Sequence, residues 1–244
     1  MLSSLRRWWT IPERVDHPEL LDSGDCSLAE VRQTFAELDD INRWLGGHAA
    51  LRRWLLPRLR EAARQQRPVR LLDVGCGGAG VSIEVVKWAR REGIALKVVA
   101  LDLTRRHLDI ARENSRDYPE ISLLLGDARQ LPFTEAEFDF VISTLFLHHL
   151  APRDLAEVLR SLASVCRRTL VLTDLVRGRL PLLFFRTAAP LFAKSRITVH
   201  DGLISIARAY RPSEIRGILQ QAGLARSQIH EHGLYYRMTI VADI

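Results

Sequence analysis

LLDVGCGGAG, residues 71–80, joins a short apolar segment to a glycine-rich turn. The apolar run, which starts at Val69, suits the centre of a parallel sheet that is covered on both faces. Gly75 and Gly77 let the backbone turn sharply and approach a ligand closely, because they carry no Cβ atom. A helix is expected directly after the turn, and its free N–H groups would point at the ligand. The stretch therefore predicts a nucleoside-binding site in a Rossmann-like α/β sheet.

Three aspartates follow the pattern of the expected strands. Asp73 stands two residues before the first glycine, where its carboxylate can reach a ligand ammonium group. Asp102 ends an apolar strand over residues 98–101, about as far past the glycines as a carboxylate that grips ribose hydroxyls. Asp127 follows a strand over residues 121–125 and could accept from an adenine amino group. The glycine pattern alone would suit a dinucleotide equally well, so Asp73, Asp127 and the strand expected over residues 138–142 decide between the two ligands.

The three aspartates at this spacing resemble those of class I S-adenosylmethionine-dependent methyltransferases. The resemblance implies a Rossmann-like, seven-stranded sheet with S-adenosyl-L-methionine as cofactor. It gives Asp73 the methionine end, Asp102 the ribose and Asp127 the adenine. The cofactor-binding residues that it implies are Asp73, Gly75, Cys76, Gly77, Asp102, Leu103, Asp127, Ala128 and Thr144. One departure is Ala79, because the family usually has glycine at this position.

The second half of the chain continues the alternation of strands and helices. A fourth strand is expected over residues 138–142 and a fifth over 169–173, with a helical stripe between them. A helix begins near Pro212. Two last strands, near residues 225–230 and 234–241, would form the antiparallel pair that closes a methyltransferase sheet. A dinucleotide dehydrogenase would lack this hairpin.

Two helices are expected before the nucleoside module. Ser27-Leu28-Ala29-Glu30 has the form of a capping box, so a helix of about four to five turns should start at Ser27. Gly46-Gly47 ends it, and a second helix leads to a basic linker near Arg67-Pro68. We expect both helices to form a lid over the cofactor cleft. The predicted organisation is a helical cap over residues 1–67 and a methyltransferase domain over 68–244, with a substrate insertion at 175–210.

Composition excludes several classes of protein. The 244 residues are 47% hydrophobic, which suffices for one substantial core. The net charge of +6 raises the question of nucleic acid, but the arginines occur as scattered pairs expected on outer helix faces. Residues 143–146 read STLF rather than the Asn/Asp-Pro-Pro-aromatic turn of enzymes that methylate nucleobases or amides. We therefore expect no nucleic-acid partner.

The cysteines and the apolar segments predict the cellular location of the protein. The three cysteines have no CxxC spacing, so they predict reduced thiols and a cytoplasmic protein. Trp8-Trp9 and the charges of residues 13–16 interrupt what a secretory signal would need. The most apolar later segment, residues 180–193, is too short and too interrupted to span a bilayer. We expect no integral membrane segment.

Motifs outside the predicted cofactor-binding residues indicate a subgroup of this family. They are Ile41-Asn42-Arg43 with Gly46-Gly47, His148-His149, Asp174-Leu175, His200-Asp201-Gly202 with Ser205, and Ala209-Tyr210. Together they resemble a bacterial subgroup associated with type III polyketide synthases. This similarity implies O-methylation of a phenolic or pyrone-type hydroxyl on a small aromatic or polyketide acceptor. Arg43, His200 and Tyr210 are the candidate substrate residues, and the oligomeric state is expected to be a monomer or a homodimer.

The reaction needs little beyond orientation and removal of a proton. Methyl transfer from a sulfonium is an in-line displacement, and a phenol or enol needs a base of near-neutral pKa. His148 and His149 stand just past the fourth strand and could supply it, or they could simply pack around the following helix. No carboxylate stands at residues 143–144 to hold a divalent ion, so a metal-independent enzyme is expected. Three alternatives stay open: carbon methylation of a quinone precursor, a non-catalytic cofactor-binding protein, and a dehydrogenase.

Overall fold

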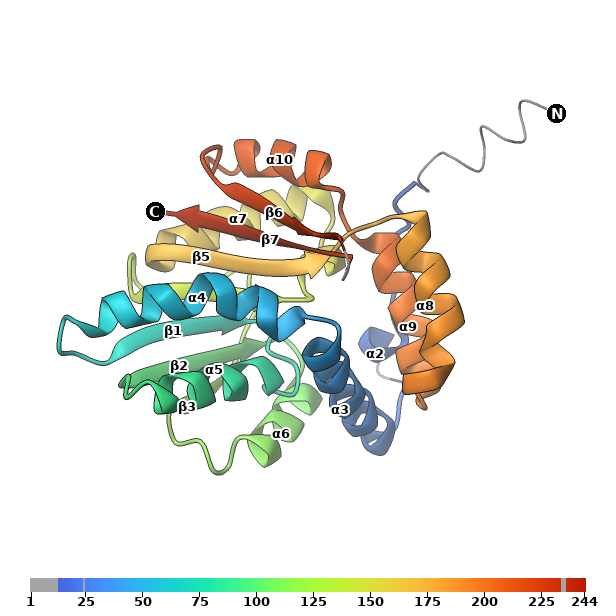
Figure 1. Ribbon diagram of the computed structural model, residues 1–244, viewed down its shortest axis with the longest axis horizontal. Coiled ribbons are helices and arrows are strands. Elements are labelled where there is room, and N and C mark those ends of the chain that lie inside the picture. The colour runs from blue at the N-terminus through green and yellow to red at the C-terminus, as the bar shows by residue number, and fades with distance from the viewer. Residues whose placement is uncertain (1–12, 24, 234–235) are drawn as a thin grey trace.

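The computed structural model describes residues 13–23, 25–233 and 236–244, and it is built around a seven-stranded sheet (Figure 1). The strands are β1 (Val69–Val74), β2 (Leu96–Asp102), β3 (Ile121–Leu125), β4 (Phe138–Thr144), β5 (Cys166–Leu175), β6 (Gln228–His232) and β7 (Arg237–Asp243). Their order across the sheet is β3-β2-β1-β4-β5-β7-β6. The first five are parallel, and β7 runs antiparallel to both β5 and β6. The seven-stranded sheet and its closing hairpin are confirmed.

The last strand is shorter than the sequence predicts. β7 begins at Arg237, whereas the apolar pattern suggests a start at residue 234. Residues 234–235 lie outside the described part of the chain, as do the first twelve residues with the Trp8-Trp9 pair. β6 begins three residues later than expected, at Gln228, because residues after α10 form a turn first.

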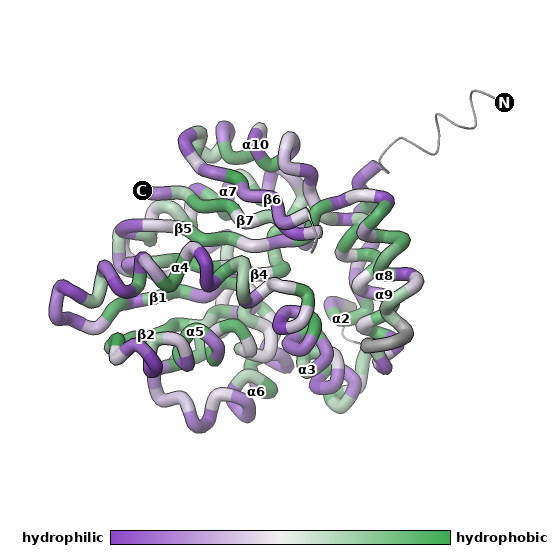
Figure 2. Tube along the Cα trace, in the orientation of Figure 1, coloured by the Kyte–Doolittle hydropathy of each residue, from purple (hydrophilic) through white to green (hydrophobic). Residues whose placement is uncertain are grey.

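The helices cover both faces of the sheet. They are α2 (Leu20–Ser23), α3 (Leu28–Trp44), α4 (Gly47–Ala63), α5 (Gly80–Arg91), α6 (Arg105–Asn114), the short 3-10 helix η1 (Leu147–His149), α7 (Pro152–Val165), α8 (Arg179–Phe192), α9 (Arg196–Arg208) and α10 (Pro212–Gln221). Successive strand residues point to opposite faces, so Leu71 packs with α4 and α5 while Leu72 packs with α7 and α10. Figure 2 shows the consequence, with the helix tubes alternating between hydrophobic green and hydrophilic purple.

The two N-terminal helices have different roles. The capping box of α3 is confirmed, since Ser27 Oγ accepts from the Glu30 backbone N–H. α3 ends at the glycine pair, where Gly46 adopts a φ of 72°. The prediction that both helices form a lid is wrong for α4, because its Leu51 and Leu55 are fully buried in the cluster that includes Leu71 of the sheet. A domain boundary at residue 67 stays a prediction.

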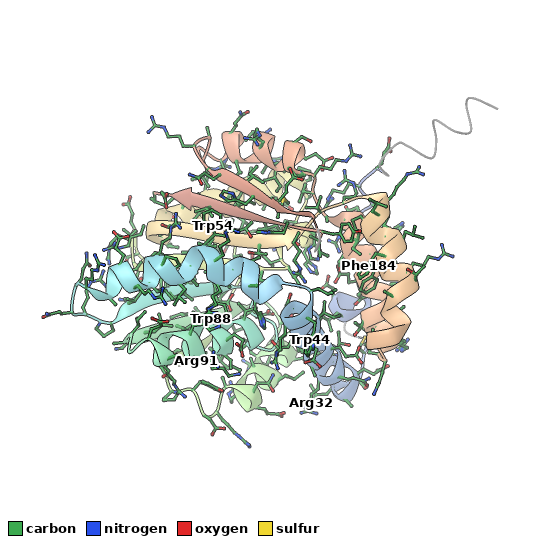
Figure 3. The ribbon with its side chains drawn as sticks, in the orientation of Figure 1. Arg32, Trp44, Trp54, Trp88, Arg91 and Phe184 are labelled. Carbon is green, nitrogen blue, oxygen red and sulfur yellow. The ribbon has the colours of Figure 1, made fainter. Side chains whose placement is uncertain are left out.

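Side chains join α4 to the far edge of the sheet. Trp54 of α4 stacks on His230 of β6, with ring centroids 3.9 Å apart, and Trp88 of α5 is buried on the same face (Figure 3). The amphipathic stripe that the sequence assigns to a cap is therefore the stripe by which α4 binds the sheet.

The predicted substrate insertion forms the helix pair α8 and α9, which Figure 1 shows beside the carboxyl ends of the strands. The pair depends on Gly202, because a Cβ atom there would stand 2.1 Å from the Phe185 ring. No helix among the described residues is both long enough and apolar enough to cross a membrane.

The role of α4 can be tested by stability. Leu55→Ala removes a fully buried side chain, so the free energy of unfolding should fall by about 2–5 kcal/mol in urea denaturation. Leu28→Ala, at an exposed position of α3, is the control and should change it by less than about 0.5 kcal/mol. Equal effects of the two variants would show that α4 does not belong to the core.

Candidate active site

The glycine-rich turn after β1 is held in a conformation that favours glycine. Gly75, Gly77 and Ala79 have φ angles of 72°, 51° and 64°. A Cβ atom on Gly75 would stand 2.6 Å from the ring of Phe146, so this position has no room for a side chain. Ala79, at the usual glycine position of the family, accepts its left-handed backbone in a fully buried site. α5 begins directly after it, as predicted.

Asp102 closes the turn from the end of β2. Its Oδ2 accepts from the Gly77 backbone N–H at 2.8 Å, and its Oδ1 accepts from the Thr104 backbone N–H at 2.9 Å. His107 Nδ1 lies 3.1 Å from Oδ1. The carboxylate is 7% exposed and lines the main cavity, which is the placement that a ribose-binding group requires.

Asp73 is a buried carboxyl group that has no cation beside it among the described residues. Ser82 Oγ donates to its Oδ2 at 2.6 Å. Burial, together with the charge of Asp102, raises the pKa of Asp73 to about 6, while the hydrogen bond from Ser82 opposes the shift. An ammonium group at this position would favour the ionised carboxylate, because a nearby opposite charge offsets desolvation.

The other predicted cofactor residues also line the cavity. Asp127 follows β3 and forms an ion pair with Arg129 at 2.6 Å, which lowers the pKa of its carboxyl group. The Thr144 hydroxyl is buried and has no hydrogen-bond partner among the described residues. The remaining members of the predicted set that line the cavity are Gly75, Cys76, Gly77, Leu103 and Ala128.

One cavity of about 870 Å³ joins this turn to the histidine pair. Its wall includes Asp73 and Asp102 at one side and His148, His149 and Glu19 at the other. The chamber is large enough for a ligand of cofactor size together with a small second molecule. The two predicted halves of the site thus meet in a single space.

His148 lies between two carboxylates. Its Nδ1 is 2.7 Å from Asp174 Oδ1, and its backbone N–H donates to Asp174 Oδ2 at 2.9 Å. Its Nε2 is 3.4 Å from Glu19 Oε1. Burial would lower the pKa of His148, but Asp174 and Glu19 outweigh this and raise it to about 10. Burial would likewise raise the pKa values of Asp174 and Glu19, yet both are lowered by the histidines. The two carboxylates therefore favour the protonated form of His148.

His149 also lies beside the Glu19 carboxylate. Its Nδ1 is 3.0 Å from Asp22 Oδ2 and its Nε2 is 3.8 Å from Glu19 Oε2. The three potential metal-ligand atoms of Glu19, His148 and His149 lie within 4.8 Å of one another. Glu19 lies beside both histidines, and metal independence stays a prediction.

The segment that carries Glu19 is anchored by α9. Asp201 accepts from the backbone N–H groups of Leu20 and Leu21 at 2.8 and 2.9 Å, and so caps α2. Ser205 Oγ donates to Glu19 Oε1 at 2.8 Å. Sequence analysis missed Glu19, because a single glutamate outside any periodic segment gives no signal. Asp201 and Ser205 do stand in a motif that it singled out.

The three predicted substrate residues do not line the cavity. Arg43 is half exposed and pairs with Asp39 at 2.9 Å, and His200 is half exposed beside Asp201. Tyr210 is buried below the cavity, where its hydroxyl donates to the Leu150 carbonyl at 2.6 Å. Burial raises its pKa to about 12. In this structure Tyr210 positions the segment that follows the histidines rather than a ligand.

Comparisons with known proteins agree with this geometry. Residues 71–169 match a family model described as "Methyltransferase domain". A demethylmenaquinone methyltransferase of Bacillus licheniformis is 28% identical over 171 residues, which cover 65% of this chain and 72% of that protein. A malonyl-[acyl-carrier protein] O-methyltransferase of Erwinia pyrifoliae is 38% identical over 120 residues, 49% of this chain and 42% of that protein.

Among solved structures, human N-acetylserotonin methyltransferase in complex with S-adenosylmethionine has a TM-score of 0.64. It shares 17% identity, and the match covers 89% of this chain and 56% of that one. At this identity the likeness establishes the fold. The family match over residues 71–169 and the similarity to named methyltransferases set aside the alternative of a dinucleotide dehydrogenase.

The charge of His148 can be tested through pH. Its pKa is raised from about 6.5 in an unfolded chain to about 10, so its stabilising contribution is present at low pH and is lost as the pH rises through 10. Between pH 7 and 9 the free energy of unfolding of the wild type should fall more steeply than that of His148→Gln. The difference in slope should approach about 1.4 kcal/mol per pH unit in urea titrations. Parallel slopes would contradict a charged His148.

Proposed function

We propose that this methyltransferase, whose residues 71–169 match the family model, transfers a methyl group from S-adenosylmethionine to a hydroxyl oxygen of a small phenolic or pyrone-type acceptor. The observation that carries the proposal is the shared cavity, which is lined by the cofactor turn and by His148 and Glu19, while Asp174 pairs with His148. An acceptor held there would lie between a methyl donor and a proton acceptor.

The residues of the turn fit the cofactor. Asp102 can accept from the ribose hydroxyls, and the buried Asp73 gains a counterion from the amino group of the methionine end. Asp127 lies at the end of β3, where it can accept from the adenine amino group. The cofactor supplies an electrophilic methyl group, and the residues of the chain bind it and keep its orientation fixed.

We assign proton removal to His148, with Asp174 as its positioning residue. Asp174 holds Nδ1, so Nε2 is the ring nitrogen that can receive a proton. A phenolic hydroxyl has a pKa of about 10, like that of tyrosine. The pKa of about 10 that His148 has beside both carboxylates keeps its ring protonated at neutral pH, so Nε2 has to give up its proton before it can accept one from the hydroxyl.

Glu19 has to leave Nε2 before an acceptor hydroxyl can bind there. It is 3.4 Å from that atom and is, with Asp174, one of the two ion-pair partners of His148. When an acceptor displaces it, Glu19 can leave as the carboxylic acid with the Nε2 proton, and the neutral ring that stays on Asp174 can then accept the hydroxyl proton. Entry of the acceptor thus prepares the base.

Carbon methylation of a quinone precursor is the second candidate. It is favoured by the similarity to the Bacillus licheniformis demethylmenaquinone methyltransferase, which extends over 72% of that protein. The same base could ionise a quinol hydroxyl and so activate the adjacent ring carbon. Incubation with resorcinol, 4-hydroxy-6-methyl-2-pyrone and a demethylated naphthoquinol, followed by mass spectrometry and NMR, separates the two. An O-methyl product supports the proposal, and a C-methyl product replaces it with the alternative.

The ribose assignment predicts a loss of cofactor affinity. Asp102→Ala removes a charged acceptor, whose hydrogen bonds typically contribute about 1.5–3 kcal/mol each. S-adenosylhomocysteine should bind at least about tenfold more weakly by calorimetry. Asp109→Ala, an exposed aspartate of α6, is the control. Unchanged affinity in folded Asp102→Ala would remove Asp102 from the site.

The base assignment predicts a loss of turnover without loss of cofactor. His148→Ala should lose roughly a hundredfold or more in kcat with resorcinol, while S-adenosylhomocysteine affinity stays near that of the wild type. The loss should shrink with 4-hydroxy-6-methyl-2-pyrone, because this acidic enol arrives already ionised. His149→Ala is the matched comparison and should retain more activity. Equal turnover of His148→Ala and the wild type across both acceptors would leave proximity as the source of catalysis.

A further inference from the structure

Arg237, the first residue of β7, is a buried cation that the proposed mechanism does not use. Its side chain is 2% exposed, and its Nε and Nη1 have no hydrogen-bond partner among the described residues. Burial lowers its pKa to about 10, against the opposing charge of Asp174, so the guanidinium stays protonated at neutral pH. Buried guanidinium N–H groups without hydrogen-bond partners are unfavourable, and a bound anion would satisfy them.

Arg237 lines the same cavity as the histidines. It pairs in register with Leu175 of β5, the neighbour of the aspartate that holds His148. The sheet order places β7 three strands from β1, which is about 14 Å at the usual strand spacing. The backbone of Arg237 therefore lies far from Asp73, on the side of the cavity where the acceptor is expected.

The surroundings of Arg237 suit an aromatic ligand. Phe184 of α8 and Tyr236 line the cavity too, and their ring centroids are 5.9 Å apart. Phe184 is labelled in Figure 3, on the helix pair that stands beside the carboxyl edge of the sheet. A ligand that contacts both rings could reach the guanidinium with a polar group.

The glycine pair at the end of α3 leaves room for this cation. A Cβ atom on Gly47 would stand 3.2 Å from Arg237 Nη1 and 2.6 Å from Asn42 Oδ1. Asn42 Oδ1 is also buried, lacks a partner among the described residues and belongs to a cavity-lining residue. Gly47 of this motif, which the methyl-transfer chemistry leaves unexplained, thus lies close to both Arg237 and Asn42.

We propose that Arg237 is the anion-binding residue of the acceptor subsite, where its guanidinium donates to a carboxylate or ionised enol oxygen of the acceptor. The inference rests on the proposed function and narrows it. The acceptor is then a phenol or pyrone that is negatively charged at neutral pH, with an apolar body that lies against Phe184 and Tyr236. The guanidinium is a specificity residue and takes no part in the proton transfer.

Two matched probes test the proposal. Resorcinol and 2,4-dihydroxybenzoate differ by one carboxylate, and each is titrated into the full chain saturated with S-adenosylhomocysteine. The wild type should bind 2,4-dihydroxybenzoate at least tenfold more tightly than resorcinol. Arg237→Met should lose this preference and keep its affinity for resorcinol, whereas Arg237→Lys should retain part of it. Arg32→Met is the control, because Arg32 lines the cavity but is half exposed and paired with Glu113.

Each outcome decides the question. A wild type that does not prefer the carboxylate probe overturns the proposal, and this comparison needs no variant to fold. An equal loss of both probes in Arg237→Met makes the residue structural. A tenfold loss of S-adenosylhomocysteine affinity in Arg237→Met would assign the guanidinium to the cofactor carboxylate instead. If the preference depends on Arg237 but no probe is methylated by mass spectrometry, the proposed function fails and the anion subsite stands.

Discussion

The reversal of strand order at β1 fixes where the site can form. β2 pairs with one edge of β1 and β4 with the other, so the chain leaves β1 and β4 in opposite directions. Their helices α5 and α7 consequently pack on opposite faces of the sheet. Between the two, the carboxyl edge of the parallel strands is left uncovered, which is where open α/β sheets bind ligands. Asp73, Thr144 and Asp174 all reach the site from this edge.

Burial gives the charged groups of this crevice different states. Burial destabilises the ionised form of Asp73, and a cationic ligand would stabilise it. His148 is balanced by two carboxylates, which make it charged despite burial. Arg237 has the charge of Asp174 nearby, but its Nε and Nη1 lack hydrogen-bond partners among the described residues, so it would gain from an anionic ligand. A positively charged ligand group is therefore favoured at the β1 end of the site, and a negatively charged group at the β7 end. A cofactor with an ammonium group and an acceptor with an oxyanion would satisfy both ends.

The fold and the cofactor turn could be predicted because their signals are local. Each strand is an apolar run, and Asp73, Asp102 and Asp127 follow from their positions on such runs. Arg43 and His200 could not be placed in this way, because each helical residue is rotated by about 100° from the last and only tertiary packing decides which side faces the cavity. α4 was assigned to a lid for the same reason, since a stripe of leucines shows that a helix is buried but not against what. Arg237 gave no signal, because its burial arises from pairing between strands far apart in the sequence.

The N-terminal segment connects acceptor binding to the helix pair of the insertion. Arg14 donates to the carbonyls of His148 and Leu150, and Arg208 of α9 donates to the carbonyl of His149. The backbone of the histidine segment is thus held from two sides while Glu19 holds its side chains. Since Glu19 is fixed by Ser205 of α9, an acceptor that displaces Glu19 also breaks a contact between the N-terminal segment and α9. The backbone contacts to the histidine segment do not involve that carboxylate, so the base can keep its position while its counterion leaves.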